Sequence, residues 1–295
     1  MNDETHVFEV EGDPVTITVD APAGPERGTV MMLAPFGMNS DSLFAPAYVM
    51  AHNGLRVLRV DPRNAPNGTA GAVRGLRLSR LSRDVGEAMD RFAPDALFAM
   101  SLSVPAAVRA LRGRGDVRAA SFVVPVVNVR ATVRAVCEED WFDRAESDSE
   151  TETVQVLGHT IDIDLVRDGR RHRFETPDDT RRDLADVPAR VSFVAGDRDP
   201  WVDIAEVRAV AASTGADVAE IPAAGHLLYR NPVLAMRFFE RAAGYLLDVI
   251  APDAPPVAVP PFNEIVRTLQ RTRRALRTSD APADGGAPER AGSAA

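Results

Sequence analysis

Two serines stand at the end of an apolar run, directly before a segment with helical spacing. The segment reads LFAMSLSVPAAVRAL, with Ser101 and Ser103 two positions apart. Ala99-Met100-Ser101-Leu102-Ser103 has the form small-x-Ser-x-small. A nucleophile on a sharp strand-to-helix turn needs that form, because larger flanking residues would clash. Ser101 is therefore the candidate nucleophile. Ser103 is expected to be the small flank and the N-cap of the following helix.

A serine nucleophile needs a general base, and the base needs an acid to orient it. On a strand–turn–helix scaffold of this kind the order along the chain is Ser, Asp, His. The run VSFVAGDRDPWVD offers Asp197, Asp199 and Asp203 after an apolar strand, and we prefer Asp199 because it lies further into the loop. His226, in EIPAAGHLLYRNP, follows a later strand. Their order behind Ser101 predicts a Ser-His-Asp triad.

Two main-chain N–H groups are expected to hold the oxyanion that forms when such a serine attacks a carbonyl. The first is the N–H of Leu102, beside the N-terminus of the helix. The second is expected in the loop PFGMNSDS, where Gly37 permits close approach of the backbone. Gly37 and Met38 are the candidates, with Phe36 as the alternative.

The elements that position these residues alternate between strand and helix patterns. Such alternation predicts a mostly parallel sheet with helices on both faces. A hairpin with period-two alternation comes first and is expected at a sheet edge. The strands are expected at residues 6–10, 15–19, 29–34, 55–60, 97–100, 120–127, 189–196 and 216–222, with helices that include 82–93, capped by Ser82.

One segment interrupts the alternation. Residues 135–184 contain an acidic stretch and an alternating hairpin with Gly158-His159 at its turn. We expect an insertion over the carboxyl edge of the sheet, where α/β proteins bind ligands. Substrate-binding roles are expected for three aromatic residues, Trp141 and Phe142 in the insertion and Trp201 beside the acid loop.

The C-terminal part has a different composition. An α/β domain is expected over residues 1–250, followed by a proline-rich linker at 251–262. An amphipathic helix with several arginines is expected at 263–278, and a tail of low apolar content at 279–295.

Composition excludes several function classes. The chain has 295 residues and a formal net charge of −9, which argues against nucleic acid as the main partner. All 34 basic residues are arginine, so a catalytic lysine is absent. Cys137 is the single cysteine and lacks the surroundings of a nucleophile. With neither a signal-peptide pattern nor an apolar run long enough for a bilayer, we expect a cytoplasmic protein.

The elbow without glycine flanks and five further segments resemble a known family. The segments are NGLRVLRVD, VVNVRATV with LGHTI, DPWV at the acid and HLLYRNP at the histidine. Over about residues 5 to 247 the chain is similar to the acyl-transferase (acyl-ACP thioesterase) of bacterial bioluminescence fatty acid reductase systems. The resemblance implies an α/β-hydrolase fold, cleavage of long-chain acyl thioesters through an acyl-serine, and Ser101, Asp199 and His226 as the triad.

Substrate and partners are left open by the sequence. The expected substrates are acyl-ACP or acyl-CoA thioesters, without metal or other cofactor. An acyl carrier protein is a candidate partner, for which Arg170, Arg171 and Arg173 or the C-terminal arginines could supply a basic docking patch. The alternatives are a carboxylesterase acting on free esters and a non-catalytic binding protein built on the same fold.

Overall fold

The structure is a computed structural model that describes residues 3–66, 73–147 and 152–279. It separates into two compact units, Met1–Val259 and Pro260–Ala295. The first unit contains the sheet and the predicted site residues. The second contains helix α10 (Phe262–Ser279), where the sequence predicts an amphipathic helix. The predicted tail lies outside the described residues from 280 onward.

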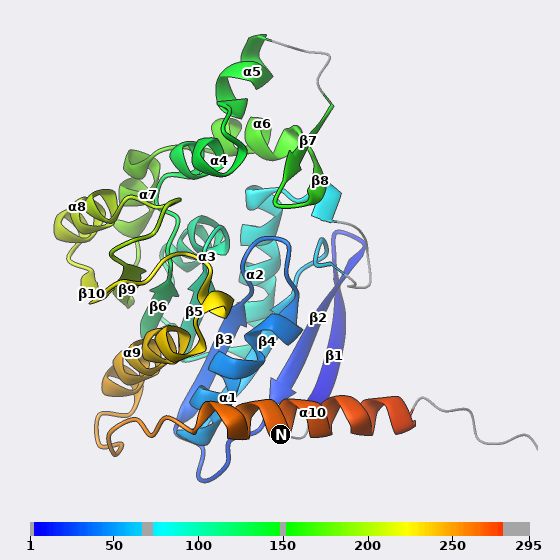
Figure 1. Ribbon diagram of the computed structural model, residues 1–295, viewed down its shortest axis with the longest axis vertical. Helices are drawn as coiled ribbons and strands as arrows, with labels where there is room; N and C mark the ends of the chain where they lie inside the picture. The colour runs from blue at the N-terminus through cyan, green and yellow to red at the C-terminus, as the bar shows by residue number, and fades with distance from the viewer. Residues whose placement is uncertain (1–2, 67–72, 148–151, 280–295) are drawn as a thin grey trace, which may run out of the picture. The chain divides into compact units, whose positions relative to one another are not determined.

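An eight-stranded sheet forms the centre of the first unit (Figure 1). Its order is β1-β2-β4-β3-β5-β6-β9-β10. β2 runs antiparallel to both of its neighbours, and the other pairs are parallel, so the N-terminal hairpin forms one edge as predicted. The strands are β1 (Asp3–Val10), β2 (Asp13–Asp20), β3 (Gly28–Leu33), β4 (Leu55–Asp61), β5 (Ala96–Met100), β6 (Ala119–Val123), β9 (Arg190–Gly196) and β10 (Asp217–Ile221).

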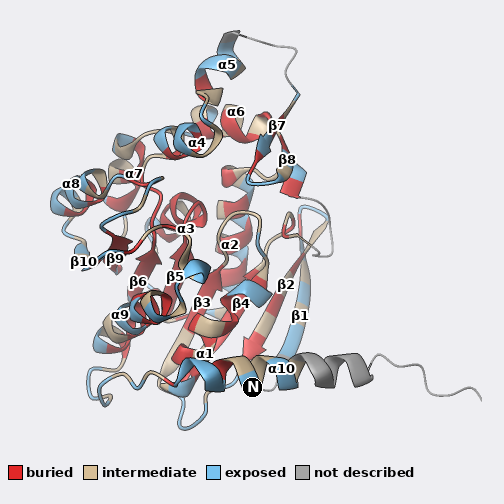
Figure 2. Cartoon of the chain, viewed as in Figure 1, coloured by how far each residue is buried: buried red, intermediate tan, exposed pale blue. Residues whose placement is uncertain are grey.

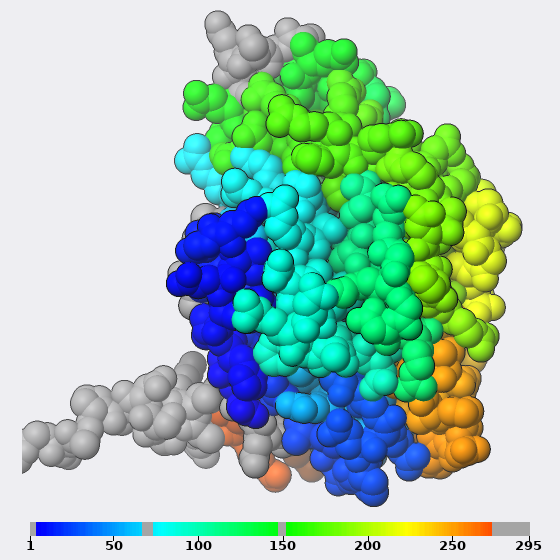
Figure 3. All heavy atoms as spheres, turned by 180° about the vertical axis from the view of Figure 1, so that it is seen from behind, coloured from blue at the N-terminus to red at the C-terminus, as the bar shows by residue number. Residues whose placement is uncertain are grey.

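Helices cover both faces of this sheet. One face carries α1 (Phe44–His52) and α9 (Pro232–Ile250). On the other face α2 (Leu78–Phe92) and α3 (Ser103–Leu111) lie side by side, as the view from behind shows (Figure 3). α7 (Pro177–Leu184) packs on α3, and α8 (Ile204–Thr214) packs on α7. The arrangement is the layered α/β architecture that the alternating pattern predicts.

The core lies where the central strands meet these helices, and Figure 2 shows their buried residues in red. Every residue of β5 and β6 is buried, because parallel strands between two helical layers have no solvent-facing side. Phe122 on β6 and Phe193 on β9 are fully buried, with ring centroids 5.9 Å apart. The nucleophile candidate therefore follows a strand that is buried along its whole length.

The insertion lies between β6 and α7, beyond the carboxyl ends of the parallel strands (Figure 1). It contains α4 (Val129–Cys137), α5 (Trp141–Ser147), β7 (Thr153–Val156), β8 (His159–Asp162) and α6 (Asp164–Arg171). The hairpin is at the predicted place, but its turn is Leu157-Gly158 and not Gly158-His159, because His159 pairs with Val156 as the first residue of β8. Its two turn residues, Leu157 and Gly158, have φ of 50° and 82°, the pattern of a tight type I′ turn. The helices around it extend the insertion to residue 129.

Polar contacts fasten the insertion to the start of α2. Asp168 of α6 accepts hydrogen bonds from the main-chain N–H of Ser79 at 3.0 Å and from its hydroxyl at 2.5 Å. Arg77 donates to Asp164 at 2.6 Å. The expectation that Ser82 caps this helix is wrong, since α2 begins a turn earlier, at Leu78. The cap is a carboxylate from a distant segment, which local spacing cannot reveal.

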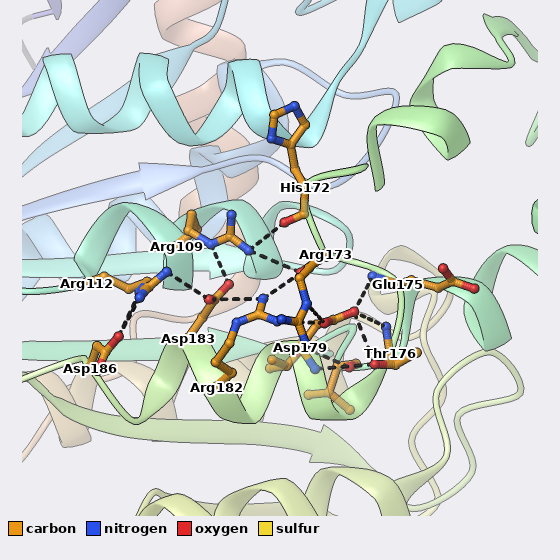
Figure 4. Close-up of polar contacts among 12 residues, drawn as sticks. Arg109, Arg112, His172, Arg173, Glu175, Thr176, Asp179, Arg182, Asp183 and Asp186 are labelled. Carbon is orange, nitrogen blue, oxygen red and sulfur yellow. Dashed lines mark hydrogen bonds and ion pairs between the residues drawn. The ribbon is translucent and has the colours of Figure 1, made fainter. Parts of the chain in front are cut away.

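A second set of contacts joins the end of the insertion to α3, the helix that follows the elbow (Figure 4). Arg109 of α3 donates to Asp183 at 2.6 Å and to the carbonyl oxygens of His172 and Arg173 at 2.9 and 3.1 Å. Asp183 is almost fully buried and also accepts from Arg112 at 3.3 Å. The insertion is thus fixed at both α2 and α3. No helix in the described ranges is long and apolar enough to cross a bilayer.

Candidate active site

Ser101 lies on a strained turn between β5 and α3. Its φ is +54°, in the left-handed region that residues with a β-carbon rarely adopt. Its main-chain N–H donates to the Val123 carbonyl at 3.1 Å, and its own carbonyl accepts from Val104 at 3.1 Å. Ala99, two residues before, is fully buried. The turn therefore has the shape of a nucleophile elbow, as the small flanks predict.

His226 connects the serine to an acid. Ser101 Oγ and His226 Nε2 are 2.7 Å apart, and His226 Nδ1 and Asp199 Oδ2 are also 2.7 Å apart. The side chains of His226 and Asp199 are only 5% and 3% exposed. Because a carboxylate can only accept, the Nδ1–H donates to Asp199, which leaves Nε2 free to accept the serine proton. The structure thus brings the three predicted residues together in one hydrogen-bonded chain.

The acid loop explains why Asp199, and not its neighbours, faces the histidine. Asp199 Oδ1 accepts from the main-chain N–H groups of Trp201 at 2.9 Å and Val202 at 3.1 Å, so its second oxygen is turned toward His226. Asp203 accepts from Ala205 at 2.8 Å and serves as the N-cap of α8. Asp197 is exposed. The sequence preference for Asp199 agrees with this placement.

Close backbone contact sets the distance between the acid loop and the histidine loop. A β-carbon added to Gly196, at the end of β9, would overlap the Ala224 carbonyl oxygen. That same oxygen accepts from the main-chain N–H of Arg198 at 2.9 Å. Only glycine allows this approach. The indole of Trp201 then packs on the imidazole, with ring centroids 4.8 Å apart, so this one of the three predicted aromatic residues contacts the site.

The expected oxyanion donors lie on two turns. In the described chain no hydrogen bond uses the main-chain N–H of Leu102, Phe36 or Gly37. The N–H of Met38 donates to the Pro35 carbonyl at 3.2 Å and closes a β-turn. Gly37 has φ +71° at the third position of this turn, the place that requires glycine in a type II turn. Met38 is therefore the least available of the predicted donors.

Hydrogen bonds at both ends fix this loop, defined as residues 35–39 and called the oxyanion loop below. At its start, the Ser103 hydroxyl donates to the Ala34 carbonyl at 2.5 Å. The expectation that Ser103 is an N-cap is therefore wrong: it is the first residue of α3, and its hydroxyl is used on β3 instead. Ser103, which stands where the second flanking glycine of an elbow usually lies, thus connects the elbow to the oxyanion loop.

At the other end, Asp61 accepts from Ser40 through both the main-chain N–H and the hydroxyl, each at 2.6 Å. Burial raises the pKa of Asp61, and the two hydrogen bonds from Ser40 oppose that rise. Arg59 donates to the Ser40 carbonyl at 3.1 Å and forms a buried pair with Asp20 at 2.7 Å. Polar groups of β2 and β4 therefore hold the far end of the oxyanion loop.

Sequence reasoning did not anticipate the position of His159. This residue starts β8, and its ring lies directly over the oxyanion loop. A β-carbon on Gly37 would be 2.5 Å from His159 Nε2, and the rings of Phe36 and His159 meet edge to face at 5.8 Å. The sequence did contain one indication of this position: a histidine next to the turn of a hairpin that was expected to lie over the carboxyl edge of the sheet.

The other two aromatic predictions fall within the insertion. Phe142 is 1% exposed and lies against Gly169 of α6, while the guanidinium of Arg144 lies 4.8 Å from the Trp141 ring centroid. Both residues therefore pack the insertion itself, and nothing in their contacts places them at Ser101.

Exposed apolar side chains occur on the segments that carry or contact the site. Met38 of the oxyanion loop is 41% exposed, Leu157 of the hairpin turn is 50% exposed and Tyr229, three residues after His226, is 65% exposed. These three residues are called the apolar rim below.

No protein-family model matches the chain, and no curated protein sequence does. Among solved structures, the chain is similar to Est1E from Butyrivibrio proteoclasticus with bound ferulic acid, at 16% identity and a TM-score of 0.69, over 83% of this chain and 99% of that one. A monoacylglycerol lipase from Paleococcus ferrophilus aligns at 13% identity and a TM-score of 0.63, over 82% and 99%. The esterase domain of a Rhodothermus marinus protein aligns at 16% and 0.60, over 82% and 97%. With this sheet order and these neighbours, the chain has the α/β-hydrolase fold.

Proposed function

We propose that the chain is a serine hydrolase of the ester-cleaving kind and that its substrates are acyl thioesters. The reaction proceeds through an acyl-Ser101 intermediate. The single observation that carries the proposal is the hydrogen-bonded chain from Ser101 through His226 to Asp199, starting on a residue with positive φ. Strain of this kind persists where the surrounding structure imposes it and is concentrated at active sites. The preference for thioesters rests on the resemblance to the acyl-ACP thioesterase family.

The geometry supports a two-step reaction. His226 Nε2 takes the proton of Ser101 Oγ as the oxygen bonds to the carbonyl carbon, and Asp199 stabilises the imidazolium that forms. The N–H of Leu102 and one N–H of the oxyanion loop donate to the oxyanion. The proton then passes to the departing thiol or alcohol as its bond to carbon breaks. Water repeats the sequence on the acyl-serine, releasing the acid and restoring Ser101.

A carboxylesterase acting on oxygen esters is the second candidate. Two of the structural neighbours favour it, since they are an esterase domain and a monoacylglycerol lipase. Both candidates share the triad, so only substrates separate them. Turnover of acyl-CoA and acyl-ACP is compared with that of oxygen esters carrying the same acyl group. A thioesterase gives the higher kcat/KM on the thioester, and negligible thioester turnover beside rapid ester cleavage selects the alternative.

Trapping the intermediate tests the shared chemistry. The full chain is incubated with acyl-CoA or acyl-ACP, and intact-mass spectrometry followed by peptide mapping locates the added acyl group, expected on Ser101. Ser101→Ala should reduce turnover by about 10⁶-fold, as in dissected triads. Ser103→Ala should lose far less activity than Ser101→Ala, because it removes only the hydrogen bond to Ala34 at the start of the oxyanion loop. If a fluorophosphonate probe fails to label the folded protein, the third reading, a non-catalytic binding protein, replaces this proposal.

Cys137 is a poor rival nucleophile. It lies on α4, and burial raises the pKa of its thiol, which reduces the thiolate available at neutral pH.

The arginines of the insertion are less suited to docking an acidic carrier protein than their spacing predicts, because carboxylates of the chain already pair with them. Arg170 pairs with Glu146 at 2.6 Å, and Arg173 pairs with Asp179 at 3.3 Å. Carrier docking therefore remains a proposal to be tested with acyl-ACP.

A further inference from the structure

A small cavity lies behind the oxyanion loop. Its volume is about 40 Å³, and its wall includes Gly37 and Leu102, the two turns expected to hold the oxyanion. The rest of the wall is mostly apolar. It comes from the end of β3, the segment after β4, the segment before α2 and the first turn of α2, and includes Leu33, Pro62, Asn64, Ala65, Pro66, Val73, Leu76, Leu78 and Leu81. The Ser103 hydroxyl also lines it, but that hydroxyl already donates to Ala34. The cavity is therefore suited to an apolar group.

The chemistry of the site assigns a substituent to this space. Once Ser101 has attacked, the carbonyl carbon carries an oxyanion, a leaving group and the acyl chain. The leaving group must lie beside His226, which supplies its proton. The cavity adjoins both oxyanion turns, whereas its wall includes no residue of the acid loop or the histidine loop. The acyl chain, directed away from His226, is the substituent that reaches it.

We propose that this cavity binds the acyl group and limits it to short, unbranched apolar chains, acetyl and propionyl. This inference rests on the proposed function. An engineered protein cavity of about 150 Å³ holds benzene, with its six carbons. By proportion, 40 Å³ holds about two carbons beyond the carbonyl. This limit departs from the long chains that the family resemblance implies.

The wall has little freedom to retreat from a longer chain. Leu78 is fully buried and Leu81 is 6% exposed, and both lie on α2, whose first turn is held by Asp168 of the insertion. Well-packed walls do not yield by a methylene without cost. Each carbon beyond the limit should therefore lower kcat/KM by about tenfold or more, the usual discrimination for one methylene.

The test measures kcat/KM of the full chain on p-nitrophenyl acetate, propionate, butyrate, hexanoate and octanoate. The wild type should lose at least about tenfold between propionate and butyrate, and again between butyrate and hexanoate. Leu81→Ala removes three carbon atoms from the wall and should raise the hexanoate-to-butyrate ratio by about tenfold. Leu76→Ala, at a half-buried position, provides a second opening that is less disruptive to folding. Leu111→Ala, a buried leucine of α3 outside the cavity, is the control and should leave the ratio unchanged.

Two results would overturn the inference: a wild type that cleaves octanoate as fast as butyrate, or variants whose ratios follow Leu111→Ala. Failure of the proposed function looks different, because then no ester is cleaved in a Ser101-dependent manner. If p-nitrophenyl acetate is cleaved and Ser101→Ala abolishes it, the hydrolase stands, and the chain-length ratios alone decide the acyl site.

Discussion

Gly37 is the position where a single methyl group should do most damage to catalysis without touching the triad. Two costs arise in Gly37→Ala. At φ +71° a residue with a β-carbon is strained by about 1–2 kcal/mol. The new carbon would also lie 2.5 Å from His159 Nε2, closer than van der Waals contact allows. Either the ring of His159 moves or the oxyanion loop does.

The size of the effect depends on which of them moves. If the loop moves, the N–H groups of Phe36 and Gly37 leave their positions, and loss of one oxyanion donor lowers kcat by about 10²–10³-fold. The tight hairpin turn and the pairing of His159 with Val156 fix the backbone position of His159, so we expect the loop to move. In Gly37→Ala/His159→Ala the overlap is relieved and only the strain remains, so kcat should recover to within about 30-fold of wild type, the equivalent of about 2 kcal/mol.

The assay is steady-state hydrolysis of p-nitrophenyl acetate by folded protein, with kcat and KM determined separately. Gly12→Ala is the matched control, because Gly12 also has positive φ, +86°, but no atom lies within 4 Å of an added β-carbon and the turn is far from the site in the chain. It should lose stability and keep kcat. Gly37→Ala activity within about threefold of wild type would refute the reasoning, as would a double variant no better than the single one.

Three further outcomes are expected. Asp199→Asn should lower kcat by about 10⁴-fold while KM changes little, because the imidazole loses its orienting carboxylate; steady-state kinetics check this, and a loss below tenfold would contradict it. Asp84→Ala should lower the free energy of unfolding in urea by about 3 kcal/mol, since Arg63, bonded to Asp84 at 2.6 Å, stays buried without it; an unchanged urea midpoint would contradict this. For Asp179, burial alone would raise the pKa, but hydrogen bonds from Thr176 and the neighbouring arginine lower it below its ordinary value of 3.8. The stability that ionised Asp179 supplies is therefore fully present above pH 3.8 and is lost as the pH falls through the lowered pKa. Asp179→Asn should make the urea midpoint of unfolding depend less on pH on the acid side. Parallel plots of urea midpoint against pH for the variant and the wild type would contradict this.

Much of the scaffold could be predicted from the sequence, because its signals are local. Apolar runs marked the central strands, period-two alternation marked the edge hairpin, and the order Ser101, Asp199, His226 followed from one strand end after another. Each of these depends on residues near one another in the chain, so one sequence is enough to find them.

What sequence reasoning missed depends on contacts between distant segments. The start of α2 is set by Asp168, and the Ser103 hydroxyl is used by Ala34. Phe142 resembled a substrate contact in the sequence but serves as the core of the insertion. His159 lies over Gly37 only because the insertion folds back across the sheet edge. Local propensity carries no information about such partners, which tertiary packing selects.

The apolar rim has a consequence for how the molecule behaves at a boundary between water and an apolar phase. Met38, Leu157 and Tyr229 are exposed on the oxyanion loop, the hairpin turn and the segment after His226, so adsorption onto a hydrophobic bead or an oil droplet should favour attachment through these segments. On a solid support such attachment would restrict access to the segments that carry the site, whereas on a droplet it would bring them toward apolar molecules dissolved in the oil.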